Sequence, residues 1–526
     1  MNKKFYITTP IYYPSNKLTL GNCYTTVVCD AIARFYRLLD YDVFYLTGTD
    51  EHGQKIEKIA NSKGISEIEH LNEIVNDTKK LWNELHISYD KFIRTTDKEH
   101  VATVTKIFNK LYENGDIYKS QYTGKYCIPC ESFWSDDQLV DEKCPDCGRE
   151  VIVTNEECYF FKLSKYEEKL KELYKNNKNF LVPQNRANEM TKNFFDKGLK
   201  DLCVSRKSVK WGIPVPFDND QTIYVWIDAL SNYISALGYL SNDDSLFKKF
   251  WPADVHVVGK EIVRFHAIIW PAILMALDLP LPTKIYGHGW LTFGNAKLSK
   301  SKEIGKKEVI DPRILLERYT ADSVRNFLIG EINFGQDGPY TQELFLNSYN
   351  NILANKVGNI ESRIIGMWLK YNNGIVQNGN TIQNSDFEFF KTIQNLKKES
   401  IDNMLDLKPT LSYRAALKII DECNLYIDDN KPWELFKDEN KKDNLNSLLY
   451  NVTQAMLEAY VLLNAFIPES TEKVLEKFNI CDFKINTNES FKFPIEGLKF
   501  EKTTPLFNRL NIPEELKVLD KIANNN

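Results

Sequence analysis

The feature that most constrains the fold is a strand–helix–strand unit at the start of the chain, which recurs far downstream. Residues 5–7 form a short apolar strand, a helical stretch follows at about 24–39, and residues 43–46 form a second buried strand. The later unit has strands at 255–258 and 284–286 around a helix at about 262–277. Strands joined through a helix pair in parallel, so we predict one α/β sheet of the split Rossmann-like kind.

The rest of the chain divides around these two units. Beyond Glu343 the apolar positions take on helical spacing to about Phe478, which predicts an all-α C-terminal region. A chain of 526 residues exceeds what one core can fill, so we expect several domains. The predicted segments are the first half of the sheet (1–116), an insertion (117–223), the second half (224–295), a lysine-loop region (296–350) and a helical domain (351–526).

Composition places limits on partners and location. The 67 basic and 72 acidic side chains give a net charge of −5, so any nucleic-acid site must be a local patch. The longest apolar run, residues 267–277, is shorter than the roughly 20 residues that cross a bilayer. The N-terminus also lacks a secretory signal. We expect a cytoplasmic protein with no membrane association.

Four of the ten cysteines fall in two Cys-x-x-Cys pairs, Cys127 with Cys130 and Cys144 with Cys147. This spacing can bring four thiolates to one tetrahedral Zn²⁺. Disulfides or chance clustering would be the alternative explanations. Four sulfurs close the coordination shell, so we predict one structural zinc per chain, which stabilises the insertion and takes no part in chemistry.

The loop between the first strand and its helix contains Thr19-Leu20-Gly21-Asn22. The N–H groups and the positive dipole end of the helix face whatever binds above the sheet, and a phosphate fits there. A glycine turn with an asparagine cap would have the same sequence.

A second polar segment, Lys297-Leu298-Ser299-Lys300-Ser301, follows the last strand of the second unit. Its two ammonium groups can stabilise polyphosphate charge, although a solvated basic loop is the simpler explanation for the segment alone. The turn at Thr19 and the lysines occupy the two ends of one split sheet, so together they indicate one nucleotide.

These two segments and four longer stretches resemble the methionyl-tRNA synthetases, a family of class I aminoacyl-tRNA synthetases. The stretches are ITTPIYYP (7–14), YLTGTDEHGQ (45–54), YVWIDAL (224–230) and FHAIIWPA (265–272). The resemblance implies ATP-dependent activation of L-methionine to methionyl-adenylate and transfer to tRNA(Met), the initiator included. It further implies Mg²⁺ with ATP, contact with the tRNA stem by residues 296–350, and anticodon binding by the helical domain.

The resemblance also implies roles for single residues. Asp50 resembles the carboxylate that holds the substrate amine, and a flexible thioether needs an adaptable apolar and aromatic wall. That wall would comprise Ile11, Tyr13, Trp226, Leu230, Tyr233 and His266. The ATP site would comprise Thr19, Gly21, Asn22, His288, Gly289 and Lys300, with Thr19, Asn22, Lys297 and Lys300 as the catalytic set. Without the resemblance, core packing would explain Trp226, and a helix cap would explain Asp50 equally well.

The chain departs from the family at the phosphate turn, where Thr19 and Asn22 replace two histidines; none of its seven histidines precedes His52. The lysine loop is also about four residues longer. A Thr-Ile-Gly-Asn turn resembles that of the tryptophanyl-tRNA synthetases, which are active, so we favour a working enzyme. A degenerate or inhibitor-resistant copy that keeps tRNA binding, and a ligase that serves a small acceptor, are the alternatives.

In the helical domain, Asn359, Arg363 and Trp433 lie in stretches that resemble the anticodon-reading segments of the family. An amide and a guanidinium suit base edges, and an indole suits stacking on an unpaired base. A helix-capping tryptophan and a solvated arginine would be the structural alternatives. The sequence shows no appended tRNA-binding dimerisation domain before Asn526, so we expect a monomer.

Overall fold

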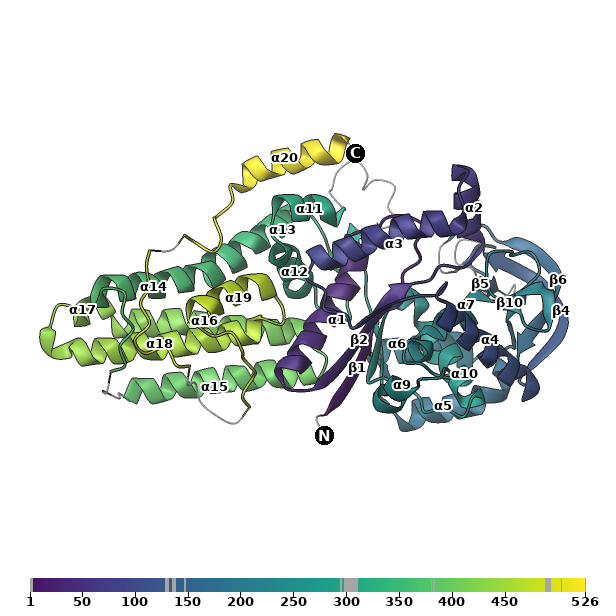
Figure 1. The fold of residues 1–526 in the computed structure, drawn as a ribbon, viewed down its shortest axis with the longest axis horizontal. Helices are drawn as coiled ribbons and strands as arrows, with labels where there is room; N and C mark the ends of the chain where they lie inside the picture. The colour runs from purple at the N-terminus through teal and green to yellow at the C-terminus, as the bar shows by residue number, and fades with distance from the viewer. Residues whose placement is uncertain are drawn as a thin grey trace.

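The core of the protein is a parallel sheet that brings together segments from three parts of the chain, 4–94, 181–182 and 255–288; Figure 1 labels its strands β1 and β2. The computed structural model describes residues 3–127, 132–134, 139–145, 148–293, 296–297, 311–379, 381, 384–487, 493–502 and 504–525. Within these, the sheet has the strand order β3-β2-β1-β12-β13-β7. Its strands are β1 (Lys4–Thr8), β2 (Asp42–Thr49), β3 (Lys91–Arg94), β7 (Leu181–Val182), β12 (Val255–Gly259) and β13 (Ile285–His288).

The parallel α/β sheet predicted from the sequence is confirmed. Ile7 of β1 pairs with Val255 of β12, so the two halves of the split sheet meet side by side. Strand order reverses between β1 and β12, and parallel sheets bind ligands at the carboxyl ends of the strands next to such a reversal. The sequence did not predict β3 or β7. The latter comes from within the predicted insertion and pairs with β13 at the sheet edge.

Two hydrophobic cores cover the two faces of the sheet, and β1 alternates between them. Phe5 and Ile7 face one core, with helix α1 (Leu20–Leu38) and the C-terminal helices, while Tyr6 faces the other. Among the helices around the sheet are α2 (Gln54–Lys63), α3 (Glu67–Glu84), α4 (Lys98–Glu113), α7 (Val225–Leu230), α8 (Asn232–Ser235), α9 (Ser245–Phe250), the π-helical turn η5 (Phe265–Ile269) and α10 (Trp270–Ala276). The second core includes residues of α7, α8, η5 and α10.

The segment between the halves carries its own antiparallel strands, seen at the right of Figure 1. They form the sheets β5-β4-β6-β8 and β10-β11-β9. The elements of this segment include β4 (Ile117–Cys127), β5 (Ser132–Trp134), β6 (Ile152–Phe161), α5 (Glu167–Asn176), α6 (Gln184–Met190), β8 (Leu202–Cys203), β9 (Ser205–Arg206), β10 (Pro214–Val215) and β11 (Asp218–Ile223). The long pairing of β4 with β6 gives the segment a frame of its own.

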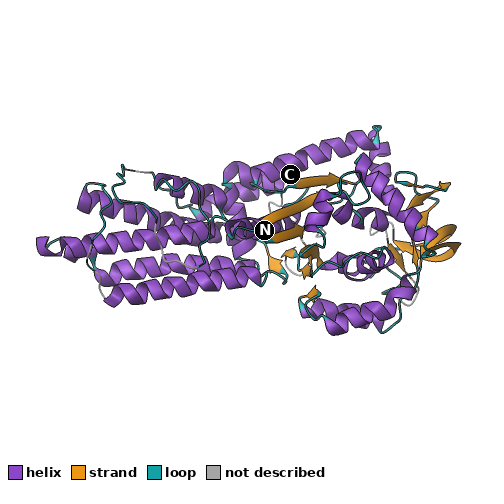
Figure 2. Cartoon of the chain, turned by 60° about the horizontal axis from the view of Figure 1, so that its bottom comes forward, coloured by secondary structure: helices purple, strands orange, loops and turns teal. Residues whose placement is uncertain are grey.

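The C-terminal region is helical, as the sequence predicted, and Figure 2 shows its long helices packed side by side. It follows β14 (Leu291–Phe293), β15 (Ala296–Lys297), α11 (Pro312–Arg318), α12 (Ala321–Gly330), β16 (Gly338–Pro339) and α13 (Gln342–Ser348). Its helices include the π-helical η8 (Tyr349–Gly358), α14 (Asn359–Asn372), α15 (Asn384–Leu405), α16 (Pro409–Asn430), α17 (Pro432–Leu435), α18 (Lys442–Leu463), α19 (Pro468–Lys477) and α20 (Ile512–Asn525). In the described part of the chain, no helix combines the length and the apolar character that membrane crossing requires.

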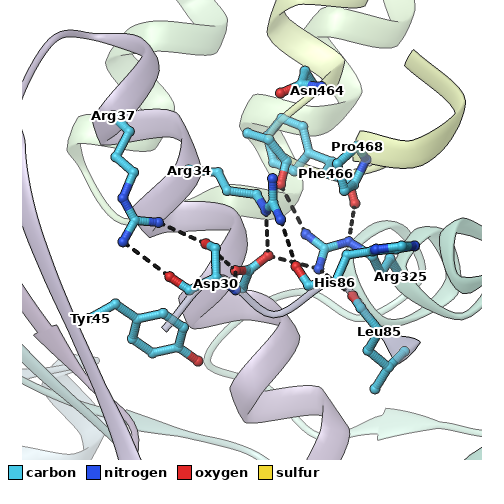
Figure 3. Close-up of polar contacts among 12 residues, drawn as sticks. Asp30, Arg34, Arg37, Tyr45, Leu85, His86, Arg325, Asn464, Phe466 and Pro468 are labelled. Carbon is cyan, nitrogen blue, oxygen red and sulfur yellow. Dashed lines mark hydrogen bonds and ion pairs between the residues drawn. The ribbon is translucent and has the colours of Figure 1, made fainter. Parts of the chain in front are cut away.

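A buried ion pair joins the helical region to the sheet, and we call it the Asp30 joint (Figure 3). Asp30 of α1 and Arg325 of α12 lie 2.8 Å apart with both side chains fully buried. Arg34 and Ser88 also donate hydrogen bonds to the Asp30 carboxylate. Arg325 donates to the backbone carbonyl of Phe466, in the turn between α18 and α19. The guanidinium therefore bridges the sheet helix and the C-terminal helices directly.

Candidate active site

The predicted phosphate turn closes on itself at the start of α1. Thr19 is the N-cap, and the side-chain Oδ1 of Asn22 accepts hydrogen bonds from the Thr19 N–H at 3.0 Å and from its hydroxyl at 3.2 Å. The threonine hydroxyl is thus directed at Asn22, which leaves the Asn22 Nδ2 as the side-chain donor that the turn can offer an anion. A Cβ at Gly21 would meet only Thr19 Oγ1 at 3.7 Å, so the protein leaves room at this point.

An arginine that the sequence analysis did not single out lies beside this turn. Arg313, at the start of α11, donates to the carbonyl oxygen of Leu18 at 3.2 Å. It also forms ion pairs with Asp77 of α3 and with Asp311. Nothing local in the sequence indicated this contact, because Arg313 and Leu18 lie 295 positions apart. A guanidinium therefore stands next to a turn that has no histidine.

The loop after β2 carries Asp50 and is held on both sides. The Tyr12 N–H donates to the carbonyl of Gly48, and the Asp50 N–H donates to the carbonyl of Tyr12, both at 2.9 Å. These bonds extend the sheet into the segment after β1. The neighbouring Glu51 is fully buried and accepts a hydrogen bond from Arg94 Nε at 2.7 Å. The backbone around Asp50 is therefore fixed before any substrate arrives.

Aromatic side chains from α7, α8 and η5 meet opposite this loop. Trp226 stacks on Phe265 with ring centroids 3.6 Å apart and ring planes 6° from parallel. The Tyr233 hydroxyl lies 2.8 Å from His266 Nε2, and His266 Nδ1 lies 2.9 Å from the carbonyl of Ile262. Burial lowers the pKa of His266 to about 4, so the ring is neutral near pH 7. Its Nδ1–H then donates to Ile262, and its Nε2 accepts from Tyr233.

The loop that carries Asp50 is joined to the aromatic wall through its neighbour His52. His52 Nδ1 lies 2.6 Å from Asp228 Oδ2, and Asp228 is on α7, two positions after Trp226. Burial raises the pKa of the Tyr233 phenol. Asp50 itself follows β2, near the strand reversal where the fold favours a ligand.

Of the other residues predicted for the methionine pocket, two pack in the core beside Tyr233 and one lies near α2. Leu230 is buried in the same core as Tyr233, and Ile11 packs against that core with part of its surface exposed. Tyr13 lies closer to α2, where Lys55 Nζ is 5.6 Å from the centre of its ring. Ile11 and Leu230 can therefore contribute apolar surface to the wall, whereas Tyr13 belongs to the rim near α2.

A buried carboxylate with two histidine partners lies behind the wall, and we call Asp228, His52, His100 and Ser235 the Asp228 cluster. Asp228 Oδ2 is 2.6 Å from His52 Nδ1, and its Oδ1 is 2.7 Å from His100 Nε2. The other nitrogen of His100 is 2.7 Å from the Ser235 hydroxyl. His52 and Asp228 fall inside the stretches that carried the family resemblance, but they received no role there; His100 had no sequence signal.

Burial and charge act in opposite directions on the pKa values of Asp228 and His52. Burial alone would raise the pKa of Asp228, but the charge of His52 and the hydrogen bonds from His100 and His52 outweigh it and lower the pKa. Burial alone would lower the pKa of His52, yet Asp228 and the charge of Glu51 raise it overall. The cluster therefore favours a carboxylate beside an imidazolium.

His288, which the sequence assigned to the ATP site, ends β13 and is 4% exposed. Its Nε2 lies 2.8 Å from the Thr25 hydroxyl of α1, and its Nδ1 lies 2.6 Å from the carbonyl of Gly289. A Cβ at Gly289 would come within 2.2 Å of the backbone of Gln336. The close approach that this glycine permits is therefore to the protein's own chain, which brings the loop at 336–337 against the end of β13.

The lysine segment is only partly described. Lys297 lies in β15, and its backbone pairs with Thr292 of β14. Lys300 lies outside the described residues. Residues 311–318 resume the chain beside the phosphate turn, through the contact of Arg313 with Leu18.

The cysteine pairs are also described in part. Cys127 and Cys144 are buried in one small cluster with Trp134, although they lie 17 positions apart in sequence. Cys130 and Cys147 lie outside the described residues. No group of metal-binding side chains was found among the described residues. Two soft thiols from the two predicted pairs, brought together in a buried cluster, are a donor set that fits zinc.

The predicted anticodon residues lie in the helical region. Asn359 begins α14 and is exposed, while Arg363 donates to Asn424 at 2.8 Å and pairs with Asp428. Trp433 lies on α17 with 40% of its surface exposed. Figure 1 shows α17 at the end of the helical region farthest from the sheet. The tryptophan is therefore partly open to solvent, while the arginine is held by neighbours on α16.

Comparison with known proteins gives a consistent result. A family model described as tRNA synthetases class I (M) matches residues 5–153 and 147–365. Methionine–tRNA ligases of Caldanaerobacter subterraneus subsp. tengcongensis and Clostridium tetani are 50% and 49% identical, each over 99% of this chain and 81% of the relative. The structure of Mycobacterium tuberculosis methionyl-tRNA synthetase in complex with methionyl-adenylate matches with a TM-score of 0.89 and 34% identity, over 96% of this chain and 100% of that one.

Proposed function

The chain belongs to the class I methionyl-tRNA synthetases, and from this premise we propose how its own residues carry out the methionine–tRNA ligase reaction. The substrates of this enzyme are methionine, ATP and tRNA(Met). In the first step a methionine carboxylate oxygen attacks the α-phosphorus of ATP, which forms methionyl-adenylate and expels pyrophosphate. In the second step a hydroxyl of the terminal ribose attacks the carbonyl carbon and releases AMP.

We propose that Asp50 binds the methionine ammonium while Trp226, Tyr233 and His266 enclose the thioether, with Leu230 and Ile11 adding apolar surface. The observation that carries this assignment is the 2.6 Å contact between His52, two positions after Asp50, and Asp228, two positions after Trp226, near the strand reversal. Neutral His266 suits the role because it presents no charge to the sulfur. Tyr13 then lines the entrance near α2.

The phosphates of ATP would bind at the start of α1. Backbone N–H groups, the helix dipole and the Asn22 amide are the donors, and Gly21 gives the phosphates room. Arg313 adds a positive charge beside Leu18, where the family's histidines are missing. His288 and Gly289 would border the adenine, and Mg²⁺ would accompany ATP as a counter-ion. Lys297 and Lys300 remain our proposed cations for the charge that develops on the phosphates during transfer.

The remaining segments would bind the tRNA and the zinc ion. The helical domain would read the anticodon through Asn359, Arg363 and Trp433, and the exposed Trp433 ring supports stacking on a base. The region around α11 and α12 would contact the tRNA stem. The cysteine cluster would hold one structural zinc through Cys127, Cys130, Cys144 and Cys147, which supplies rigidity to the insertion. We further propose a monomer that works in the cytoplasm.

The test of these assignments is methionine-dependent exchange of pyrophosphate into ATP, followed by charging of tRNA(Met) transcript. Asp50→Asn should raise the KM for methionine because it removes the ammonium's counter-charge. Lys300→Ala should lower the exchange rate by roughly 10²–10³, as expected when a cation is lost from the transition state. Normal kinetics in either variant would remove that residue from the mechanism. Tight tRNA binding without any exchange would indicate a degenerate enzyme.

A further inference from the structure

The Asp228 cluster connects the two sides of the proposed methionine site. Asp50 and His52 lie two positions apart in the loop after β2, and Trp226 and Asp228 lie two positions apart on α7. The 2.6 Å contact between His52 and Asp228 is therefore a direct bridge from the loop that carries the ammonium ligand to the helix that carries the thioether wall.

The same carboxylate is held from behind by two further helices. His100 belongs to α4 and Ser235 to α8, and both are buried. His100 Nε2–H donates to Asp228, and the other ring nitrogen, Nδ1, lies 2.7 Å from the Ser235 hydroxyl. Both carboxylate oxygens of Asp228 are thus engaged from opposite sides, and the side chain is only 1% exposed. Neither α7 nor the loop can shift without breaking a buried hydrogen bond, which is costly.

The loop end of the bridge is equally fixed. The indole Nε1–H of Trp211 donates to the carbonyl of Glu51 at 2.7 Å, and its ring lies 5.6 Å from that of His52. Gly53 N–H donates in turn to the carbonyl of Trp211 at 3.0 Å. The loop is therefore held by Trp211 on one side and by Asp228 of α7 on the other. The contact with Asp228 is made by the side chain of His52.

We propose that Asp228 is a positioning residue which, through His52 and His100, fixes the distance between the ammonium ligand and the thioether wall and so determines which amino-acid length the enzyme accepts. The proposal rests on the proposed roles of Asp50 and Trp226. A substrate must reach both sides at once, so a rigid spacing favours methionine over ethionine, which is one methylene longer, and over homocysteine, which is one carbon shorter. None of the three residues touches the reacting atoms.

The experiment measures pyrophosphate exchange with methionine, ethionine and homocysteine for the wild type, Asp228→Asn and His52→Ala. Asparagine can accept from one histidine only, and its amide N–H₂ opposes the other donor. We expect the KM for methionine to rise about tenfold, as loss of one hydrogen bond to a charged group predicts, with the KM for ATP within about twofold of the wild type. The preference for methionine over ethionine in kcat/KM should fall at least about fivefold.

Two further variants separate positioning from stability. His52→Asn keeps an N–H near the place of Nδ1 and should restore most of the methionine preference that His52→Ala loses. Asp116→Asn is the matched control, because Asp116 is also a buried carboxylate, bonded to Lys165 and Tyr166, but belongs to neither side of the site. It should lower the melting temperature without changing the ratio of methionine to ethionine.

The outcomes distinguish this inference from the proposed function. If the wild type catalyses methionine-dependent exchange but Asp228→Asn and His52→Ala keep its selectivity, the positioning role is wrong and the proposed function stands. If Asp228→Asn does not fold, His52→Ala decides alone, because it leaves the contact between Asp228 and His100 in place. If the KM values for methionine and ATP rise together, or Asp116→Asn changes the selectivity equally, the cluster acts only through general stability and the inference is overturned.

Discussion

Two buried carboxylates hold this enzyme together in different ways. Asp30, in the Asp30 joint, pairs with arginines, whose charge is permanent across all accessible pH. Asp228, in the Asp228 cluster, contacts His52 and His100, and the pKa of His52 is raised above its ordinary value of 6.5. The first joins the sheet to the helical region, and the second joins the two sides of the proposed methionine site.

Arginine and histidine partners give a buried carboxylate different responses to pH. Burial alone would raise the pKa of Asp30, but Arg34, Arg325 and Ser88 outweigh it and lower the pKa to about 2. That joint should therefore be unaffected by physiological changes of pH. The Asp228 cluster lies beside a site that must bind an ammonium and release a product, and its strength should depend on pH because His52 titrates. Four predictions test this contrast.

The largest effect should come from Arg325→Met. It leaves Asp30 buried without its partner on α12 and removes the bonds to the carbonyls of Leu85, Ala465 and Phe466. Breaking a buried pair in this way costs about 3–5 kcal/mol. Thermal unfolding and limited proteolysis between the sheet and the helices should both detect it. Lys398→Ala, which removes an exposed pair with Asp402 on α15, is the control and should cost under about 0.5 kcal/mol.

The second effect is the loss of the Asp30 contribution to stability at low pH. The folded pKa of Asp30, about 2, lies below its ordinary value of 3.8, so the stabilisation is fully present above pH 3.8 and is lost as the pH falls toward 2. The shift corresponds to roughly 2 kcal/mol. The stability difference between the wild type and Asp30→Asn should be constant from pH 8 to 5 and shrink below pH 4. A difference that varied between pH 8 and 5 would remove the contrast with Asp228.

The third effect is the loss of the His52 contribution to stability as the pH rises, the opposite of the Asp30 dependence. The pKa of His52 is raised above its ordinary value of 6.5, so its contribution is fully present below pH 6.5 and is lost as the pH rises through the folded pKa. His52→Ala should cost about 1.5 kcal/mol at pH 6 and less at pH 9. Melting temperatures of both proteins at the two pH values provide the measurement. Since both retain His100, their difference isolates His52, and an equal cost at both pH values would contradict the prediction.

The smallest effect should come from an exposed pair. Asp428 holds Arg363 on the outer surface of the helical region, with 58% of its side chain exposed. Solvent screens such a pair, so Asp428→Ala should change stability by about 0–1 kcal/mol. If Arg363 contacts the anticodon, the same variant should change the KM for tRNA(Met) in charging while leaving pyrophosphate exchange unchanged. Equal effects on both reactions would argue against a role for Arg363 in tRNA recognition.

Much of the fold could be predicted because its signals are local. Strands β1, β2, β12 and β13 are short apolar runs bounded by helices, and the helical region keeps its apolar spacing over more than a hundred residues. Strand β7 was missed because two residues carry no periodicity. It becomes a strand only because the edge of β13 offers backbone partners.

The candidate site was predictable to a smaller extent. Trp226 and His266 lie within two of the stretches that resemble the family, Tyr233 lies three positions after one of them, and the structure brings the three rings together. The Thr19 hydroxyl was expected to face a phosphate, but it donates to Asn22, because an unpaired helix start draws nearby side chains as caps. Arg313 was missed because its partners lie on other elements.

The sequence by itself determined the α/β class, the family, the cysteine pairs and the absence of histidine from the phosphate turn, since each is a matter of residue type at short spacing. Only the tertiary structure decided which carboxylate meets which cation. Asp228 lies 176 positions from His52 and 128 from His100, and Arg325 lies 295 positions from Asp30. Such contacts form only when the packing of apolar helices and strands has removed water and brought these groups together, since no local pattern links residues so far apart.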